Sequence, residues 1–457
     1  MASSLASPKE GKLLTWRLLL PLFLLVTLIN LVFTSTRCLR SALAVADQGG
    51  SALSLPFYEL LGTMPLACLV AWGLSRLLRR HTFSKVFGIA TLAFVTFFLA
   101  FAFAIYPSWR LALFGLPGPL KQLPILAFFA VAELWKVVLL TVLLFGLLNS
   151  SVQLRSAQFY YAPLMLGTSF GALLVGPMDS LAHWLLAPWL APFLLDSWHC
   201  SIGEQLLFCS GLALVSWALF AGLARSLSGD LVIESTPSEA PPFLGQALAH
   251  TWSHPLLRSI GAIVISDYVV YSLFEVVFLD LAKQTYPSPD DYRQLMGLLS
   301  QGGGVLTALF ALVIGPWLLT RSSWQIAALV TPLGVFLLAF SFFAAITAHE
   351  QQLALYIGCL LYAFGRAAKY GLLDPAKELA FIPLDRHSQQ AGKMAIDGIA
   401  SRFGRASASF FLLFFGATPA ATAPLLLFFT GVWLYHTLHA AGAVQEELLP
   451  ASAHPTA

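Results

Sequence analysis

Charged side chains are scarce in this chain of 457 residues. They make up 10% of the sequence, whereas a soluble domain carries about 25% charged residues. Hydrophobic residues make up 58%, and the mean hydropathy is +0.79 over a length that corresponds to about three soluble domains. So many apolar residues cannot all be packed into soluble cores. The composition therefore excludes an ordinary soluble globular protein and indicates a protein whose solvent is lipid.

The sequence also lacks the usual marks of a metal site, a disulfide framework or a soluble enzyme. Its five cysteines show no CxxC or Cys/His ligand spacing, and their odd number argues against a closed disulfide framework. It contains no P-loop GxxxxGK[ST], no HExxH and no GxSxG followed by a plausible triad. The net charge of +3 is too small and too scattered for a nucleic-acid-binding surface. We therefore expect no enzyme activity, no metal, no cofactor and no nucleic-acid partner.

Twelve apolar runs are long enough to cross a bilayer. A hydrocarbon core about 30 Å thick needs about 20 apolar residues in a helix, and lipid offers no partner for an open strand edge. The sequence therefore predicts an all-α polytopic membrane protein with 12 transmembrane helices. The runs lie near residues 18–34, 55–77, 86–106, 123–148, 159–176, 206–224, 256–279, 295–319, 326–348, 353–372, 394–416 and 424–441. Between the fifth and sixth runs we expect a long loop, 178–200, whose three tryptophans suit the membrane interface.

A polar stretch rich in Ser, Pro and acidic residues divides these runs six and six. It covers residues 226–250 and predicts a cytoplasmic linker between a first six-helix bundle, 18–225, and a second, 251–441. Most Lys and Arg beside the spans lie on the side that holds both ends of the chain, which predicts that this side is cytoplasmic. Residues 1–17 and 442–457 are then a cytoplasmic N-terminus and a cytoplasmic C-terminal tail.

Several ionisable residues lie within or beside the predicted spans. Each such group costs about 2.5–3.5 kcal/mol at membrane depth, so it is rare unless it pairs or faces a water-filled path. Glu133 and Lys136 lie three residues apart on the fourth span, where they can form an ion pair. Asp267 and Glu275 lie about 80° apart around the seventh span, so both can face one cavity. Around the tenth and eleventh spans lie Arg366, Lys369, Lys377, Asp397, Arg402 and Arg405.

These charges allow two interpretations. They can fasten helices to one another or reach from helix ends to the membrane interface. They can also line a cavity for an anion, because Arg binds phosphate in a bidentate manner and Lys supplies a compact charge. Cations around the tenth and eleventh spans would then attract a polyphosphate, and the buried acids would shape the cavity or pass a proton.

Four stretches of sequence carry longer motifs. The first is Ala132–Trp135, followed by Phe145, Gly146, Asn149, Phe159, Tyr160 and Gly167. The second is Glu275 and Val276, followed by Lys283, Gln284, Tyr286, Pro287, Pro289, Asp291, Tyr292, Met296 and Gly297. The third is Ala368–Tyr370 with Asp374, Pro375, Lys377, Glu378, Ala380 and Ile382–Asp385. The fourth is Gly392, Lys393, Ala395–Asp397, Ser401, Arg402 and Gly404. From about Pro56 to Phe411 the chain thus resembles the nucleotide transporter family, the ATP/ADP translocases of plastids and obligate intracellular bacteria.

The resemblance implies a fold similar to the major facilitator type, with two six-helix bundles around a central cavity and alternating access. It also implies counter-exchange of purine nucleotides, typically external ATP for internal ADP plus phosphate. Family substrate-binding charges fall on Glu133, Glu275 and Lys369. The family's first-helix motif, Arg-Asp-Thr-Lys-Asp, falls where this chain has Arg40 in place of the Lys and lacks both acids. The Thr-Trp-Lys that usually follows the seventh-helix motif is replaced by Val277–Leu279, and Lys136 stands where Gly is common.

The sequence therefore predicts a monomeric transporter of a bacterial inner membrane that exchanges ATP for ADP or a related nucleotide pair. The absence of a plastid-type presequence favours a bacterial plasma membrane over an organelle envelope. The predicted substrate-binding residues are Arg40, Glu133, Lys136, Glu275, Lys369 and Arg402, with Asp267, Lys377, Asp397 and Arg405 as secondary candidates. Exchange would follow because an empty carrier with unpaired cavity charges returns slowly.

Two alternatives remain open on the sequence. The first is a proton-coupled or uniport carrier of another nucleotide or organic anion, in which Glu133 or Glu275 titrates. The second is a polytopic membrane enzyme or nucleotide sensor, which would use a nucleotide without moving it across the membrane.

Overall fold

A computed structural model shows a chain that is almost entirely helical in the residues it describes. These residues are 16–47, 50–78, 80–112, 122–145, 147, 166–194, 196–230, 244–381, 384–385, 388–389, 392 and 395–448, and no strand occurs among them. The chain divides into two compact units. The first comprises residues 1–40 and 65–234, and the second comprises residues 41–64 and 235–457.

The first unit is built from long apolar helices. They are α1 (Trp16–Val45, of which the unit includes residues up to Arg40), α3 (Met64–Leu78, from Pro65), α4 (Phe83–Ala100), α5 (Tyr106–Ala112), α7 (Leu123–Lys136), α10 (Val175–Leu190) and α11 (Ser197–Asp230). Two π-helical segments, η2 (Phe101–Ile105) and η4 (Val137–Leu144), and the 3₁₀ turn η5 (Ala191–Phe193) continue them.

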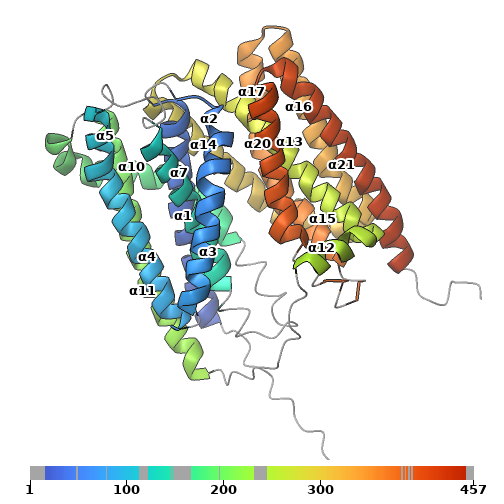
Figure 1. Cartoon of the computed structure of the whole chain (residues 1–457), viewed down its shortest axis with the longest axis horizontal. Helices are drawn as coiled ribbons and strands as arrows, with labels where there is room; N and C mark the ends of the chain where they lie inside the picture. The colour runs from blue at the N-terminus through green and yellow to red at the C-terminus, as the bar shows by residue number, and fades with distance from the viewer. Residues whose placement is uncertain are drawn as a thin grey trace, which may run out of the picture. The chain divides into compact units, whose positions relative to one another are not determined.

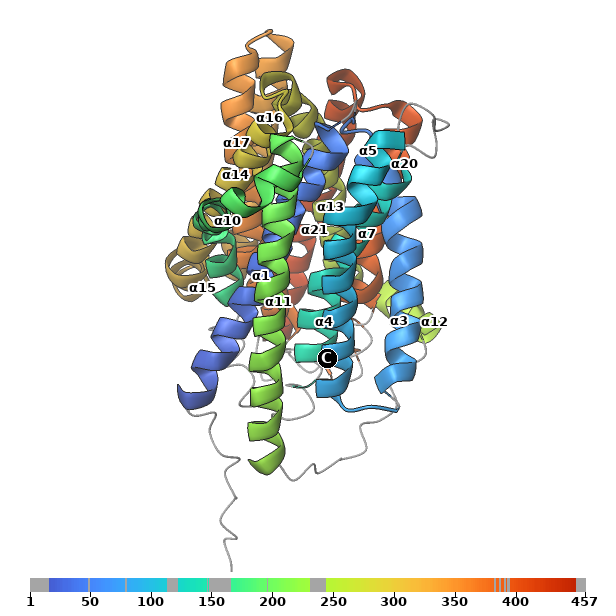
Figure 2. The same ribbon diagram turned by 90° about the vertical axis from the view of Figure 1, so that its left-hand side faces the viewer.

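Two close contacts hold this first unit together. Helices α4 and α11 lie side by side (Figure 2), with the rings of Phe87 and Phe220 stacked at 4.0 Å between centroids. At Gly88 a Cβ would lie 2.6 Å from the Trp217 ring, so the approach of the two helices requires glycine. Helix α7 is joined to α1 by the Trp135 indole, which donates a hydrogen bond of 2.9 Å to a carbonyl oxygen of α1.

The second unit is arranged around α13, which packs against α17, α20 and α21 (Figure 1). Proline occupies the first turn of both α13 and α14, where its missing N–H is not needed. The α-helices are α2 (Ser54–Tyr58), α12 (Leu244–Ser253), α13 (Pro255–Thr285), α14 (Pro289–Leu309), α15 (Gly315–Arg321), α16 (Trp324–Thr347), α17 (Gln351–Ala368), α18 (Asp374–Phe381), α20 (Ser401–Phe415) and α21 (Pro419–Leu448). The π-helical segments are η1 (Glu59–Thr63), η6 (Phe310–Ile314), η7 (Lys369–Leu373) and η8 (Ile396–Ala400).

Nine helices of the described part of the chain are long and apolar enough to cross a membrane. They cover residues 19–45, 54–78, 83–112, 123–144, 197–225, 255–285, 289–319, 324–347 and 419–442. A tenth candidate is a pair of helices, 166–173 and 175–193, bent by 45°. The all-α polytopic fold is thereby confirmed, whereas the count of twelve spans stays a prediction. The other two predicted runs, 353–372 and 394–416, fall on α17 with η7 and on η8 with α20.

The region between the fifth and sixth predicted spans is a helix rather than the expected loop. Helix α10 occupies most of it, and α11 begins as early as Ser197. Trp184 and Trp189 of α10 are 74% and 76% exposed, because nothing in the described part of the chain covers this apolar face. Apolar periodicity in 178–200 was hidden by its prolines, which an intramembrane helix tolerates. The first part of the fifth predicted span, 159–165, lies outside the described residues.

Candidate functional site

A buried ion pair joins α1 to α7 in the first unit. Arg40 lies near the end of α1, and its Nη1 is 2.5 Å from Oε2 of Glu133 on α7. The two side chains are only 9% and 15% exposed. The guanidinium also lies over the ring of Phe129, one helical turn before Glu133, with 4.3 Å between Cζ and the ring centroid. Helix α7 therefore presents an acid and an aromatic face to the same cation, and both restrain the position of Arg40.

Lys136 is the last residue of α7, on the same side of the helix as Glu133. Its Nζ lies 5.3 Å from the centroid of the Phe33 ring on α1. The sequence suggested that Lys136 can form an ion pair with Glu133, which stays a prediction; the structure shows that the Glu133 carboxylate contacts a cation from a different helix, Arg40. Sequence spacing alone reveals partners on the same helix, which is why Arg40 was not identified as the partner.

The second unit contains a corresponding pair. Lys369, the first residue of η7, forms an ion pair with Asp267 of α13, and the two side chains are 14% and 8% exposed. The Lys369 Nζ also lies 3.9 Å from the centroid of the Tyr268 ring. Arg405 of α20 approaches the same ring, with its Cζ at 5.2 Å, and its Nη1 is 3.3 Å from Oε1 of Glu59 on η1. One aromatic ring thus contacts two cations from different helices.

A cavity of about 170 Å³ adjoins this second pair. Its walls combine charged, hydroxyl and apolar side chains from α13, η7, α18 and α20: Ile263, Val264, Asp267, Tyr268, Lys369, Leu373, Asp374, Lys377 and Ser401. The wall contains two lysines and two aspartates, so its formal charges balance. Lys377 also lies 3.8 Å from a carboxylate oxygen of its neighbour, Glu378.

The two ion pairs occupy matching places in the helix order of their units. α1 and α7 contain the first and fourth predicted spans, and α13 and η7 contain the seventh and tenth, which are the first and fourth of the second half. In the first unit the cation lies on the first of these helices, whereas in the second unit the acid does. Lys369 begins a π-helical segment, and Lys136 directly precedes another. Such segments often occur at functional sites.

Glu275 and Arg402, two other predicted site residues, are not among the residues that line the cavity. Glu275 lies on α13 two turns beyond Asp267; it is half-buried and is not among the residues that line the cavity. Arg402, the second residue of α20, has an exposed side chain, although its neighbour Ser401 does line the cavity. Asp397 falls within η8, and its side chain lies outside the described residues.

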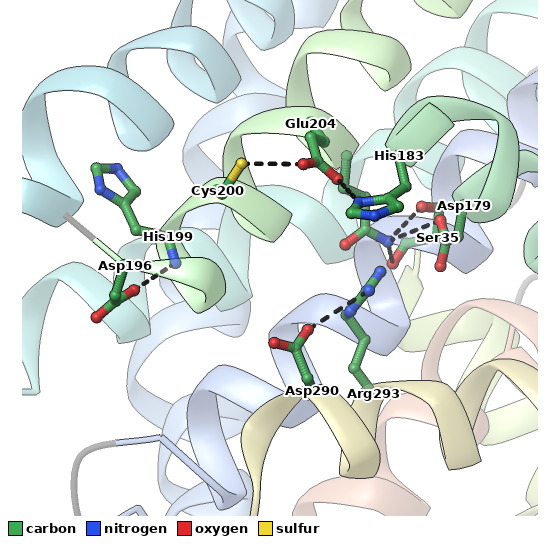
Figure 3. Close-up of polar contacts among 10 residues, drawn as sticks. Ser35, Asp179, His183, Asp196, His199, Cys200, Glu204, Asp290 and Arg293 are labelled. Atoms are coloured by element: carbon green, nitrogen blue, oxygen red, sulfur yellow. Dashed lines mark hydrogen bonds and ion pairs between the residues drawn. The ribbon is translucent and has the colours of Figure 1, made fainter. Parts of the chain in front are cut away.

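A polar cluster in the first unit was not found from the sequence (Figure 3). Glu204 of α11 is 4% exposed and accepts a hydrogen bond from the Cys200 thiol at 3.0 Å, while Nδ1 of His183 also lies 3.0 Å from its carboxylate. Gln205 donates to a serine hydroxyl of α1 at 2.6 Å and to Asp179 at 3.4 Å. The sequence predicted a loop over 178–200 and a sixth span from 206, so Glu204 fell outside every predicted span. The i, i+4 spacing of Asp179 and His183 was the signal that would have placed them on one helix face.

Asp196 lies between η5 and α11, outside the spanning helices, and is held by two donors. The backbone N–H of His199 donates to it at 2.8 Å, and Arg110 of α5 forms an ion pair with it at 2.5 Å. Burial raises the pKa of Asp196, but the His199 hydrogen bond and the Arg110 charge together outweigh burial and hold that pKa below its ordinary value.

Comparison with known families agrees with this architecture. The family model described as TLC ATP/ADP transporter matches residues 12–114 and 120–441. The chain belongs to the TLC ATP/ADP transporter family. Two proteins with a similar sequence are ADP,ATP carrier protein 1 of Chlamydia muridarum and ADP,ATP carrier protein 1, chloroplastic, of Arabidopsis thaliana. The first is 26% identical over 95% of this chain and 91% of the relative, and the second is 28% identical over 95% of this chain and 75% of the relative.

Two solved structures of transporters have a fold similar to that of this chain. A bacterial homologue of the human lysosomal transporter Spinster matches 94% of this chain and 97% of its own, with a TM-score of 0.56 and 13% identity. A D-xylose–proton symporter matches 96% of this chain and 99% of its own, with a TM-score of 0.53 and 16% identity. The likeness confirms a major-facilitator-like fold and, at such low identity, extends to the fold alone.

Proposed function

We propose that this chain is a membrane transporter that exchanges ATP for ADP, or for a related nucleotide, by alternating access. The match to the TLC ATP/ADP transporter family over most of the chain carries the proposal. It is supported by relatives named ADP,ATP carrier protein that align with 95% of the chain. A carrier, rather than an enzyme, is also what the family implies.

The buried cations suit a polyphosphate. Arg40 in one unit and Lys369 in the other are each held in a defined place by an acid and an aromatic ring. Hydrogen bonds from such cations to phosphate oxygens are among the stronger polar contacts in proteins, and Arg adds two parallel donors. We assign phosphate binding to these two side chains. Glu133 shapes the first site as the counter-ion of Arg40.

Transport by purified protein in liposomes tests the proposal. Vesicles loaded with ADP should accumulate labelled ATP, and release of labelled ADP should be much faster with nucleotide outside than without it. Lys369→Gln, which removes a cation of the cavity, and Glu275→Gln, which removes a charge that the family uses for substrate binding although it lies outside this cavity, should each abolish the exchange, while the variants remain folded and inserted. If labelled ATP is converted but never accumulates inside, the carrier assignment fails. Wild-type rates in either variant would remove that residue from the site.

The identity of the exchanged nucleotide is open to direct test. This chain has Arg40 where family members use Lys, and Val277–Leu279 where they have Thr-Trp-Lys, so one basic residue is absent. A panel of unlabelled nucleotides, competing against labelled ATP in intact expressing cells, should rank purine nucleotides with two or three phosphates first. A pyrimidine nucleotide or a non-nucleotide anion that competes better would reassign the substrate.

We further propose that the protein functions as a monomer in a bacterial inner membrane, with both termini in the cytoplasm. The excess of Lys and Arg on that side supports this orientation. Terminal tags should therefore resist protease in intact spheroplasts and be cleaved only after the membrane is opened.

A further inference from the structure

The cation proposed to bind phosphate in the second unit is already neutralised by an acid. Lys369 is paired with Asp267, which is 5% exposed and fixed on a long, well-packed helix, α13. Because the adjoining cavity also balances its charges, a polyphosphate entering it would meet no net positive charge. An anion can gain the full interaction with Lys369 only if that lysine leaves its carboxylate.

We propose that Asp267 is an internal counter-ion, which occupies Lys369 in the empty carrier and is displaced from it by a substrate phosphate. The inference rests on the proposed function. It assigns a positioning role to a residue that acts on the nucleotide through Lys369. Asp267 therefore sets both the apparent affinity for nucleotide and the ease with which the empty carrier returns.

The geometry allows the exchange of partners without a rearrangement of the helices. Asp267 and Lys369 both line the cavity of about 170 Å³, so a phosphate group in it would lie beside the ion pair. The Tyr268 ring contacts the ammonium at 3.9 Å and would stay beside it while the carboxylate is replaced. Lys377 and the Ser401 hydroxyl face the same space and can donate to the incoming oxygens.

The Asp267–Lys369 ion pair changes the expected reason why uptake of one nucleotide is coupled to release of another. The sequence-based hypothesis attributed obligatory exchange to unpaired cavity charges in the empty carrier. In the structure Lys369 and Arg40 are both paired, so the empty form bears no isolated buried cation at these positions. An unpaired buried charge is costly, whereas a paired one is much less so. The empty carrier can therefore return, more slowly than the loaded one, and net uptake should accompany exchange.

Asp267→Asn tests this role. With no competing carboxylate, the KM for ATP in exchange should fall at least about fivefold, the lower end of ordinary coupling between two ligands. Net uptake into vesicles without internal nucleotide should fall by a similar factor relative to exchange, because the empty variant leaves Lys369 unpaired. Asp267→Glu keeps the charge and should keep both values near those of the wild type.

Asp280→Asn is the matched control. This variant removes one carboxylate from the same helix. The Asp280 carboxylate accepts a hydrogen bond from Gln284 and is not among the groups that line the cavity. Both the KM and the ratio of net uptake to exchange should stay unchanged in this variant. A purely structural role of Asp267 would lower the maximal rate or the yield in Asp267→Asn and leave the KM and the ratio unmoved.

The outcomes separate this inference from the proposed function. If the wild type shows no nucleotide exchange at all, the proposed function fails. If exchange proceeds and Asp267→Asn has an unchanged or higher KM, the counter-ion role is overturned. Should Asp267→Asn not insert, the wild type decides: measurable uptake into nucleotide-free vesicles supports the inference, and strict dependence on internal nucleotide contradicts it.

Discussion

The Arg40–Glu133 pair gives the sharpest test of how the buried charges act on folding. Both side chains are at most 15% exposed, so solvent screens their interaction little. Replacing either residue alone by Met removes the opposite charge that the other contacts in the buried interior, which costs about 3–5 kcal/mol of the free energy of unfolding. Replacing both residues by Met removes the cost of burying the two charges together with the attraction between them. The double variant should then be within about 1 kcal/mol of the wild type or more stable than it.

The assay is unfolding of purified protein in mixed micelles, followed by tryptophan fluorescence, for the wild type, the two single variants and the double variant. The Arg110–Asp196 pair is the matched control, because its side chains are 22% and 41% exposed. Arg110→Met should therefore cost less than about 1 kcal/mol.

Stability and transport should separate in the double variant. It should fold yet fail to exchange nucleotides, because position 40 no longer carries a cation for phosphate. A double variant as unstable as either single variant would refute the reasoning, since the ion pair would then not be the source of the cost. Wild-type exchange by the double variant would remove Arg40 from the substrate site.

Three further results follow from individual contacts. Gly404→Ala should destabilise the second unit, because its Cβ would lie 2.8 Å from a backbone oxygen of α13, whereas Gly297→Ala meets nothing within 4 Å and should be neutral; thermal unfolding of both variants checks this. Tyr268→Leu should raise the KM for nucleotide by removing the ring beside two cations, each contact contributing about 0.5–2 kcal/mol, while Tyr268→Phe should keep the wild-type KM. Asp196 has a lowered pKa in the folded protein, so its contribution to stability is present above its ordinary pKa of 3.8 and is lost as the pH falls through the folded value. Unfolding temperatures measured from about pH 5 to about pH 3 should fall more steeply for the wild type than for Asp196→Asn.

The pattern of apolar residues predicted most of the fold because a segment that spans a bilayer must satisfy its backbone hydrogen bonds internally. A run of about 20 apolar residues must be helical in a bilayer, so the position of most helices follows from composition alone. The patterning missed α10, whose prolines resemble those of a loop. It also missed the early start of α11 at Ser197, where polar residues precede the apolar run.

Residue types indicated which ionisable side chains lie in apolar surroundings, but they did not indicate which residues those side chains pair with. Glu133, Lys369 and Asp267 were each identified as ionisable groups in apolar surroundings. Their partners lie on other helices, more than 90 residues away along the chain, and no local spacing reveals such contacts. Arg40 was recognised as a substitute for a family lysine rather than as the partner of Glu133.

In the proposed function, buried, paired cations bind the phosphates of a nucleotide that the protein moves across the membrane. Counter-exchange in liposomes containing only the purified protein tests it most directly. The account predicts that labelled ATP accumulates in vesicles loaded with ADP, and that Lys369→Gln vesicles with equal amounts of folded protein accumulate none. Equal accumulation by wild-type and Lys369→Gln vesicles would contradict it.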